Sequence, residues 1–207
     1  MRHEQAPEYL NDRSPHDAPE RRADDRTLTV YRTARVERAD DAGLWRVRNM
    51  SDRGMLLETG AIVLPDEKLT VALSETVIVA GRVAWASEGR CGIAFDEAIS
   101  VSDVLRQLVA EQESKSFRPL RLQVRCSARL LVDAEPIEIM VNTISQLGVG
   151  FAYEGDLQEE AQVGLMLADN IWRRGNIRWV REGKVGLRLA SPFALSELES
   201  VSRFRSA

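Results

Sequence analysis

The 207-residue sequence has few of the side chains that most enzymes use for acid–base chemistry and metal binding. Its two histidines, His3 and His16, both lie in the polar N-terminal stretch, so the folded body has none for a general base, a triad or a metal site. The two cysteines, Cys91 and Cys126, stand singly without CxxC spacing, which is typical of reduced structural thiols. No carboxylate pair or P-loop stands out. We therefore expect a protein that is not an enzyme and needs no cofactor or metal.

Long apolar runs are also missing. No stretch of about 18 uncharged apolar residues exists, and the N-terminus lacks the apolar core of a secretion signal. We therefore expect a cytoplasmic protein without membrane insertion. The composition, 44% hydrophobic and 29% charged, is typical of globular proteins. The net charge of −4 argues against a broad nucleic-acid surface, so neither DNA nor RNA is expected as a partner.

Lysine is scarce, since only three of the 28 basic residues are lysine and the others are arginine. The planar guanidinium suits bidentate recognition of phosphate and of the guanine edge. A genomic bias toward arginine would produce the same skew, and it is the better interpretation for most of these residues.

An internal repeat organises the chain. The segment GRVAWASEGRCGIAF begins at Gly81, and GNIRWVREGKVGLRL begins at Gly175, 94 positions later, with Gly, Trp, Glu, Gly and Gly in register. At the same offset Ser51 falls on Ser145 and Gly54 on Gly148. Because one ungapped register covers most of the chain, we predict two copies of one fold.

Each copy has the pattern of a small all-β domain. Short stretches rich in branched and aromatic residues alternate with turn residues, which predicts antiparallel strands closed into a barrel. In the first copy the predicted strands are Thr27–Val36, Leu44–Met50, Met55–Glu58, Leu69–Leu73, Thr76–Trp85 and Cys91–Phe95.

Helical spacing follows each predicted barrel. Apolar residues recur at helical intervals in Ile99–Glu113, and Ser100 or Ser102 could cap its start. A matching segment, Phe193–Phe204, ends the second copy, so a C-terminal helix is expected after both barrels. The predicted organisation is a disordered tail over 1–20, a first domain over 21–113 and a second over 117–205.

Two motifs in the first copy could hold an anion. Arg22 and Arg26 form an RxxxR pair ahead of the first strand, and residues 49–54 read NxSxxG at the junction of two strands. The arginines would supply forked donors to phosphate or guanine, and Asn49 and Ser51 could add hydrogen bonds. Gly54 would permit the turn.

Together, RxxxR, NxSxxG, GxVxW and the strand GIAF resemble the PilZ domain, a six-stranded bacterial barrel that binds the second messenger cyclic dimeric GMP (c-di-GMP). The resemblance implies that Arg22 and Arg26 wrap the ligand and that Asn49 and Ser51 hydrogen-bond it, while Gly54 shapes the loop. Arg21, beside them, is a possible additional contact. The predicted fold is thus mainly β, with two PilZ-like barrels in tandem.

The second copy has lost most of this pattern. The 94-residue offset places Ser116, Leu120 and Thr143 where the first copy has Arg22, Arg26 and Asn49. Arg121 and Arg125 also spell RxxxR, but Arg125 falls inside the expected first strand. We interpret the second copy as a barrel with a degenerate ligand motif, whose remaining Ser145 and Gly148 serve the turn.

The sequence therefore predicts a c-di-GMP receptor that relays binding to its second domain or to a protein partner of unknown identity. An alternative is a nucleotide-independent adaptor that acts only through protein contacts. In that case, Trp172, Trp179 and the adjacent Arg173 and Arg174 mark the candidate partner surface, although Trp172 could be a core residue and Trp179 is expected to be one. Asp52 and Glu58, near the motif, are interpreted as solvated charges.

Overall fold

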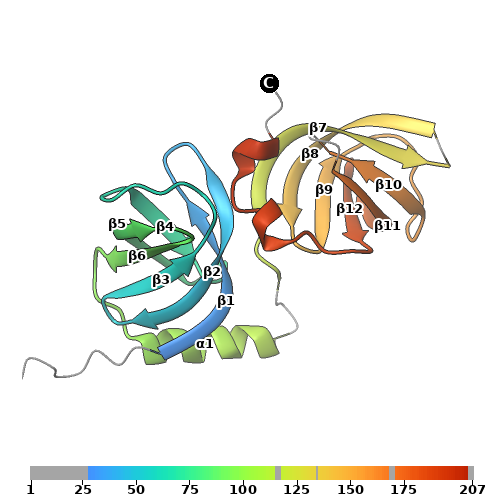
Figure 1. Cartoon of the computed structure of the whole chain (residues 1–207). Coiled ribbons are helices and arrows are strands. Elements are labelled where there is room, and N and C mark those ends of the chain that lie inside the picture. Colours follow the sequence, from blue (N-terminus) through green and yellow to red (C-terminus); the bar gives the residue numbers. More distant parts are fainter. Residues whose placement is uncertain (1–27, 115–117, 134, 168–170, 205–207) are drawn as a thin grey trace, which may run out of the picture.

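A computed structural model describes residues 28–114, 118–133, 135–167 and 171–204. It contains two closed six-stranded antiparallel barrels that stand side by side (Figure 1). The tail over 1–20 and the predicted ligand residues Arg21, Arg22 and Arg26 lie outside the described residues.

The first barrel follows the strand order β1-β2-β3-β6-β5-β4 and closes where β1 pairs with β4. Its strands are β1 (Leu28–Glu37), β2 (Ala42–Ser51), β3 (Gly54–Glu58), β4 (Lys68–Ala72), β5 (Ile78–Ser87) and β6 (Arg90–Phe95). Alternate residues of each strand face inward, so branched side chains and Trp45 fill the interior.

The second barrel has the corresponding order β10-β11-β12-β9-β8-β7. Its strands are β7 (Leu122–Val132), β8 (Glu135–Ser145), β9 (Gly148–Ala152), β10 (Gln162–Met166), β11 (Trp172–Arg181) and β12 (Lys184–Leu189). The last four strands coincide with β3–β6 at the 94-residue offset. The β-bulges coincide too, since the shift between Val83 and Trp85 recurs between Ile177 and Trp179. The repeat read from the sequence is therefore a repeat of structure.

One helix, α1 (Val101–Glu113), follows the first barrel and lies beneath it beside β1 (Figure 1). Ser100 caps its start, because its side chain accepts a hydrogen bond from the Asp103 amide. Val101 and Leu108 are buried against the barrel core. Within the described part of the chain, no helix has the length and apolarity needed to cross a membrane.

The expected helix at the end of the second copy is wrong. The segment instead forms two short 3-10 turns, η2 (Leu195–Glu197) and η3 (Val201–Phe204). Between them, the carbonyl of Leu198 accepts from the Leu44 amide, and that of Glu199 accepts from Trp45 Nε1. An α-helix would use these carbonyls for its own i+4 bonds, so docking to β2 interrupts it.

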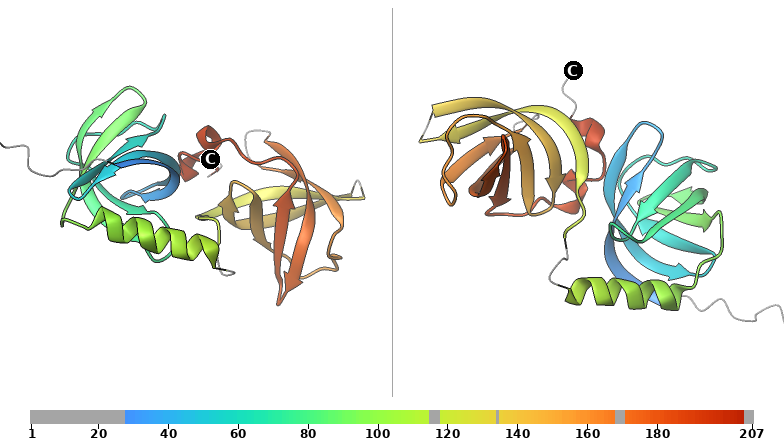
Figure 2. Two further views of the ribbon diagram at one scale, coloured as in Figure 1. Left: turned by 90° about the horizontal axis from the view of Figure 1, so that it is seen from below. Right: turned by 180° about the vertical axis from the view of Figure 1, so that it is seen from behind.

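These contacts join the two barrels. The C-terminal segment runs between them in all three views (Figures 1 and 2). Leu44 of β2 is 1% exposed and packs in the core cluster of the second barrel. The Ser202 amide donates to Asp41 Oδ1 (3.1 Å), and Arg35 Nη1 donates to the Arg121 carbonyl (3.3 Å). Strand β2 therefore belongs to the first barrel and also forms the seam with the second.

Candidate functional site

The NxSxxG residues lie where β2 turns into β3. Ser51 Oγ donates to the Gly54 carbonyl at 3.4 Å, which closes the turn. Gly54 allows β3 to approach β6, because a Cβ there would lie 2.3 Å from the Ile93 carbonyl oxygen. Any larger residue would push the two strands apart. Ser51 and Gly54 therefore have a structural reason for their positions apart from any ligand.

A shallow pocket opens beside this turn on the outer face of the barrel. It brings together three predicted ligand residues, Asn49, Ser51 and Gly54. The other residues that line it are Arg53, Met55, Leu56, Ala84, Trp85, Gly92, Ile93 and Ala94. Within the described part of the chain, the half-buried Asn49 amide has no hydrogen-bond partner. Its donor and acceptor are thus available to a ligand.

Trp85 is a pocket residue that the sequence reasoning missed. Its side chain is 47% exposed and lies over Gly92, where an added Cβ would meet the indole Nε1 at 2.1 Å. Glycine at that position lets the ring lie against the sheet. The seven-residue spacing from Trp to Gly recurs in the second copy, and this was the available signal. The result is an apolar plate at the edge of the pocket.

The expectation that Trp179 is a core residue is wrong, because this ring also lies on the outside of its barrel. Trp179 lies half-buried over Gly186 on the outer face of the second barrel. Simple alternation from the buried Ile177 would turn it inward, but the bulge between these two residues reverses the alternation. Trp172 is also on the outer face, 43% exposed and packed over Gly164.

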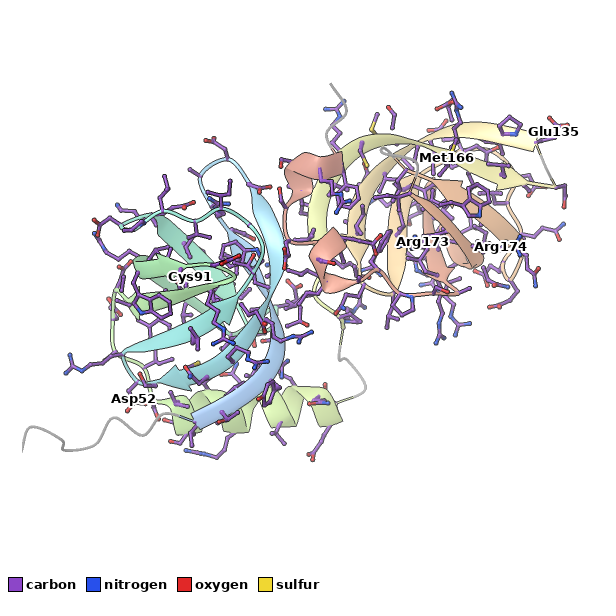
Figure 3. The ribbon with its side chains drawn as sticks, viewed as in Figure 1. Asp52, Cys91, Glu135, Met166, Arg173 and Arg174 are labelled. Atoms are coloured by element: carbon purple, nitrogen blue, oxygen red, sulfur yellow. The ribbon has the colours of Figure 1, made fainter. Side chains whose placement is uncertain are left out.

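Asp52 connects the pocket turn to helix α1. Its Oδ1 accepts from the Val101 amide at 2.9 Å, and its carbonyl accepts from the Ile99 amide at 2.9 Å. Figure 3 shows Asp52 at the start of the helix. A carboxylate is favourable there, since helix N-terminal amides are unpaired and carry partial positive charge. Asp52 is therefore exposed but engaged, and the interpretation as a merely solvated charge is incomplete.

Two arginines add positive charge near the pocket. Arg53 lines it, is exposed and makes no side-chain ion pair with any described residue. Arg48, on β2 beside Asn49, lies 4.9 Å over the Tyr31 ring and 3.4 Å from Glu58 Oε2. Glu58 thus has a cationic partner rather than water alone. Of the two, only Arg53 lines the pocket, and its guanidinium is unpaired among the described residues.

The corresponding face of the second barrel is occupied by its own chain. Ser145 Oγ donates to the Gly148 carbonyl at 3.1 Å, which repeats the turn of the first barrel. Arg121 Nη1 donates to Thr143 Oγ1 at 3.3 Å, at the position equivalent to Asn49. Burial, reinforced by the nearby charge of Arg118, lowers the pKa of Arg121. Arg125 is exposed on β7, as expected for a strand residue.

Part of the candidate partner surface is used internally. Arg173 donates to both carboxylate oxygens of Glu197, at 2.6 and 2.7 Å, and lies 4.7 Å over the Phe193 ring. It therefore anchors the C-terminal segment. Arg174 is exposed (Figure 3).

Reactive groups are few in the described residues. No cluster of three or more histidine, cysteine, aspartate or glutamate side chains in this part could hold a metal ion. Burial raises the pKa of the Cys91 thiol to about 11 and also raises that of Cys126. A thiol with a raised pKa is a poor nucleophile at neutral pH.

Comparisons with known proteins found one matching family model and several similar structures. Residues 20–111 match the model of the PilZ domain, a range that includes the RxxxR and NxSxxG motifs. A search of curated proteins found no match.

Three similar solved structures have low sequence identity to the chain. PlzA of Borreliella burgdorferi in complex with c-di-GMP is 7% identical, with a TM-score of 0.35, covering 79% of this chain and 86% of its own. The Bacillus subtilis inhibitor of motility MotI (DgrA) is 10% identical, with a TM-score of 0.33 and coverage of 81% and 90%. YcgR of Escherichia coli in complex with c-di-GMP is 10% identical, with a TM-score of 0.30 and coverage of 76% and 75%.

Proposed function

We propose that this chain is a c-di-GMP receptor and that the ligand binds on the outer face of the first barrel, because residues 20–111 match the model of the PilZ domain. The observation that carries the proposal is the pocket at the β2–β3 turn, where the Asn49 side-chain amide, which pairs with no described residue, lies beside the exposed ring of Trp85. Hydrogen-bonding groups beside an aromatic plate suit a guanine base.

Chain connectivity supports a role for the arginine pair. Thr29 is the cross-strand partner of Asn49, and Arg26 precedes Thr29 by three residues. Three residues span at most about 10 Å, and an arginine side chain adds several ångströms of reach. Arg26 can therefore contact a ligand held at Asn49, and Arg22 precedes Arg26 by four residues. In the proposed complex both bind phosphate or guanine, and Arg21 is a further contact.

The second barrel is proposed to be a degenerate copy that does not bind the dinucleotide. Arg121 lies against Thr143, so the position of the Asn49 amide is taken by a hydroxyl that already has a donor. The two expected arginine positions hold Ser116 and Leu120. Loss of two charge-assisted contacts, each worth about 1.5–3 kcal/mol, would lower affinity by orders of magnitude.

Isothermal titration of the full chain with c-di-GMP tests this proposal. Wild-type protein should bind with micromolar or tighter affinity at one site, and Arg22→Ala, Arg26→Ala and Asn49→Ala should each weaken binding at least about tenfold. Thr143→Ala, at the equivalent position of the second barrel, is the matched control and should bind like wild type. Absence of binding by the wild type would refute the proposal. Equal loss from Thr143→Ala would refute the assignment to the first barrel.

Strand β2 links the proposed ligand site to the second barrel. Strand β2 carries Asn49 at one end and contacts the second barrel through Leu44 and Trp45 at the other. A ligand that orders the arm around the first barrel could therefore alter the seam or a surface read by a cytoplasmic partner protein. The protein would act as a receptor, without catalysing a reaction itself.

A nucleotide-independent adaptor is the second candidate, favoured by the exposure of Trp172 on the second barrel. A large exposed apolar ring beside the exposed Arg174 suits a protein interface. Recovery of a partner in equal amounts with and without c-di-GMP, and its loss in Trp172→Ala, would favour this function.

A further inference from the structure

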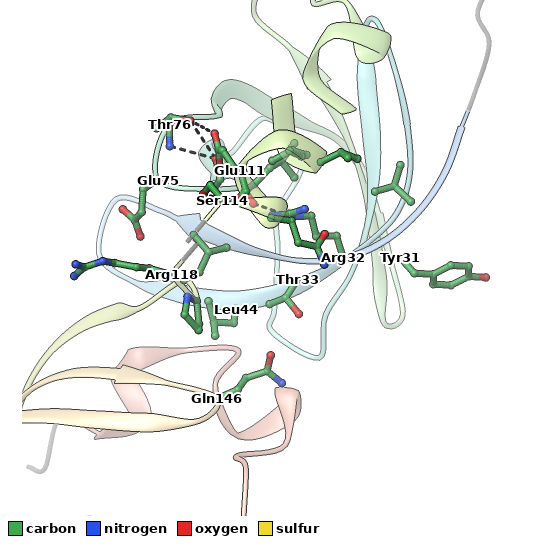
Figure 4. Close-up of a pocket in the computed structure, with 18 of the residues that line it drawn as sticks. Tyr31, Arg32, Thr33, Leu44, Glu75, Thr76, Glu111, Ser114, Arg118 and Gln146 are labelled. Atoms are coloured by element: carbon green, nitrogen blue, oxygen red, sulfur yellow. Dashed lines mark hydrogen bonds between the residues drawn. The ribbon is translucent and has the colours of Figure 1, made fainter. Parts of the chain in front are cut away.

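A pocket lies at the seam of the two barrels, away from the NxSxxG turn (Figure 4). Its volume is about 740 Å³. The lining comes from β1, the β4–β5 loop, α1, the segment Arg118–Leu120 and the β8–β9 turn of the second barrel. A pocket of 300–1,000 Å³ between domains is the usual setting of a small-molecule site.

The wall of this seam pocket is mainly apolar. Leu44, Leu73 and Leu108 form buried parts of it. Val109 of α1 and Leu147 of the β8–β9 turn remain 55% and 45% exposed although both line the same pocket. These two side chains belong to different elements and are in contact with water. An apolar molecule that covered both would lower the free energy by removing their apolar surface from water.

Two guanidinium groups supply the polar part. Arg32 is half-buried, its Nε donates to the Leu73 carbonyl at 2.9 Å, and burial lowers its pKa, although Glu111 opposes this effect. Arg118 comes from the segment between the barrels and is exposed at the margin (Figure 4). It forms no ion pair with any described residue.

The acidic groups of the pocket are already engaged. Glu75 accepts from Arg35 Nη1 at 3.1 Å, and Glu111 is hydrogen-bonded to Thr76 and Gln107. Arg118 also adds to the positive field of Arg121 rather than offsetting it. At the margin of the pocket, Arg118 therefore carries a positive charge that forms no ion pair with a carboxylate of the described residues.

We propose that the seam pocket binds a small amphipathic anion, with its apolar body against Val109 and Leu147 and its anionic group at Arg118. A carboxylate or sulfonate on an aliphatic or aromatic body has this chemistry. Such a ligand would contact both barrels and α1, and so it would stabilise their docked arrangement. The seam pocket and the pocket at the NxSxxG turn share no lining residue. The site is thus separate from the one proposed above.

Fluorescence titration of the full chain with 8-anilinonaphthalene-1-sulfonate tests the proposal, because this probe joins an apolar body to one anionic group. We expect saturable, blue-shifted binding at one site, displaced by decanoate. Charge reversal in Arg118→Glu should weaken it at least about tenfold, since a contact to a charged group is worth about 1.5–3 kcal/mol. Leu147→Asp should weaken it similarly. N-phenyl-1-naphthylamine, which lacks the sulfonate, should bind less tightly than the anionic probe.

Arg181→Glu is the control, because Arg181 is an exposed residue of the second barrel outside the pocket. It should bind the probe like wild type. No saturable binding by the wild type, or equal weakening in Arg181→Glu and Arg118→Glu, would overturn the proposal. The Arg118→Glu protein should still bind c-di-GMP like wild type. That titration verifies that the variant is folded and separates this proposal from the receptor function.

Discussion

Substitution of Gly43 by alanine should loosen the seam between the two barrels. Gly43 lies in β2, where the C-terminal segment crosses it. An added Cβ would lie 1.9 Å from the Glu199 carbonyl oxygen and 2.4 Å from its carbon. Both are backbone atoms, so a change of rotamer cannot relieve the clash. The segment must move away from β2.

The size of the destabilisation follows from the contacts that this movement of the C-terminal segment breaks. Leu198 and Glu199 accept three hydrogen bonds that join the segment to the first barrel: Leu44 N to Leu198 O (2.7 Å), Trp45 Nε1 to Glu199 O (2.9 Å) and Gly60 N to Glu199 Oε2 (2.8 Å). Each contributes about 0.5–1.5 kcal/mol net. Exposure of Leu44, which packs in the core of the second barrel, would cost about 1.5–3 kcal/mol more. The expected loss of docking free energy is therefore about 3–7 kcal/mol.

Urea unfolding monitored by tryptophan fluorescence measures this loss. Wild-type protein should unfold as one cooperative unit, whereas Gly43→Ala should unfold at lower urea concentration with separate transitions for the two barrels. Gly60→Ala is the control, because its Cβ would meet only the Glu199 carboxylate, at 2.8 Å, and this side chain can rotate away. Its expected cost is about 0.5–1.5 kcal/mol, the contribution of the single Gly60–Glu199 hydrogen bond that this rotation breaks. Equal stability of the two variants would refute the reasoning about the seam.

Three further predictions concern single side chains. Trp85→Ala should weaken c-di-GMP binding about tenfold, through loss of about 1–3 kcal/mol of base stacking, while Trp179→Ala should leave it unchanged in the same titration. Because burial raises the pKa of Cys91 to about 11, above the ordinary 9.0, this thiol should resist a disulfide reagent at about pH 8 until the protein is unfolded. The same shift stabilises the fold fully below the ordinary value, and this contribution is lost as the pH rises through about 11, which unfolding measured against pH would detect. The hydrogen bonds of Arg38 to Glu67 lower the pKa of that carboxyl below 4.5, so they stabilise the fold above this value and cease to do so as the pH falls through the lowered pKa. Glu67→Gln should therefore be about 1 kcal/mol less stable than wild type near pH 7 and should lose that difference in acid.

Much of the barrel architecture is determined locally and could be predicted. Strand β6 was expected from Cys91 to Phe95 and runs from Arg90 to Phe95. Its period-2 alternation and the glycine turn ahead of it specify the strand without reference to distant residues. Gly89 has a φ of +72°, a conformation that favours glycine, and Gly183 has +70° at the equivalent place. The sequence also predicts a cap at Ser100 or Ser102, and Ser100 is the cap, because capping depends on residues within one turn.

The candidate site was predicted in part. Asn49, Ser51 and Gly54 belong to one short motif, and they line the same pocket. Trp85 lines this pocket too, but it comes from another strand, β5. Its outward direction depends on the bulge beside Val83, and a bulge is not evident from alternation alone. Pairing across the sheet decides which strands share a face, and a linear motif carries no information about it.

The amino-acid sequence by itself determined the two-copy organisation and the strands, because alternation and turn chemistry are local properties. Only the tertiary structure decided how the two copies contact each other and which side chains their contacts occupy. Docking of the C-terminal segment on β2 replaced the second helix with 3-10 turns, since Leu198 and Glu199 give their carbonyls to the other barrel. Arg121 reached Thr143 across the second barrel, and the seam pocket arose between elements far apart in the chain. The physical reason is that these features depend on contacts between surfaces, which exist only once both barrels have closed and met.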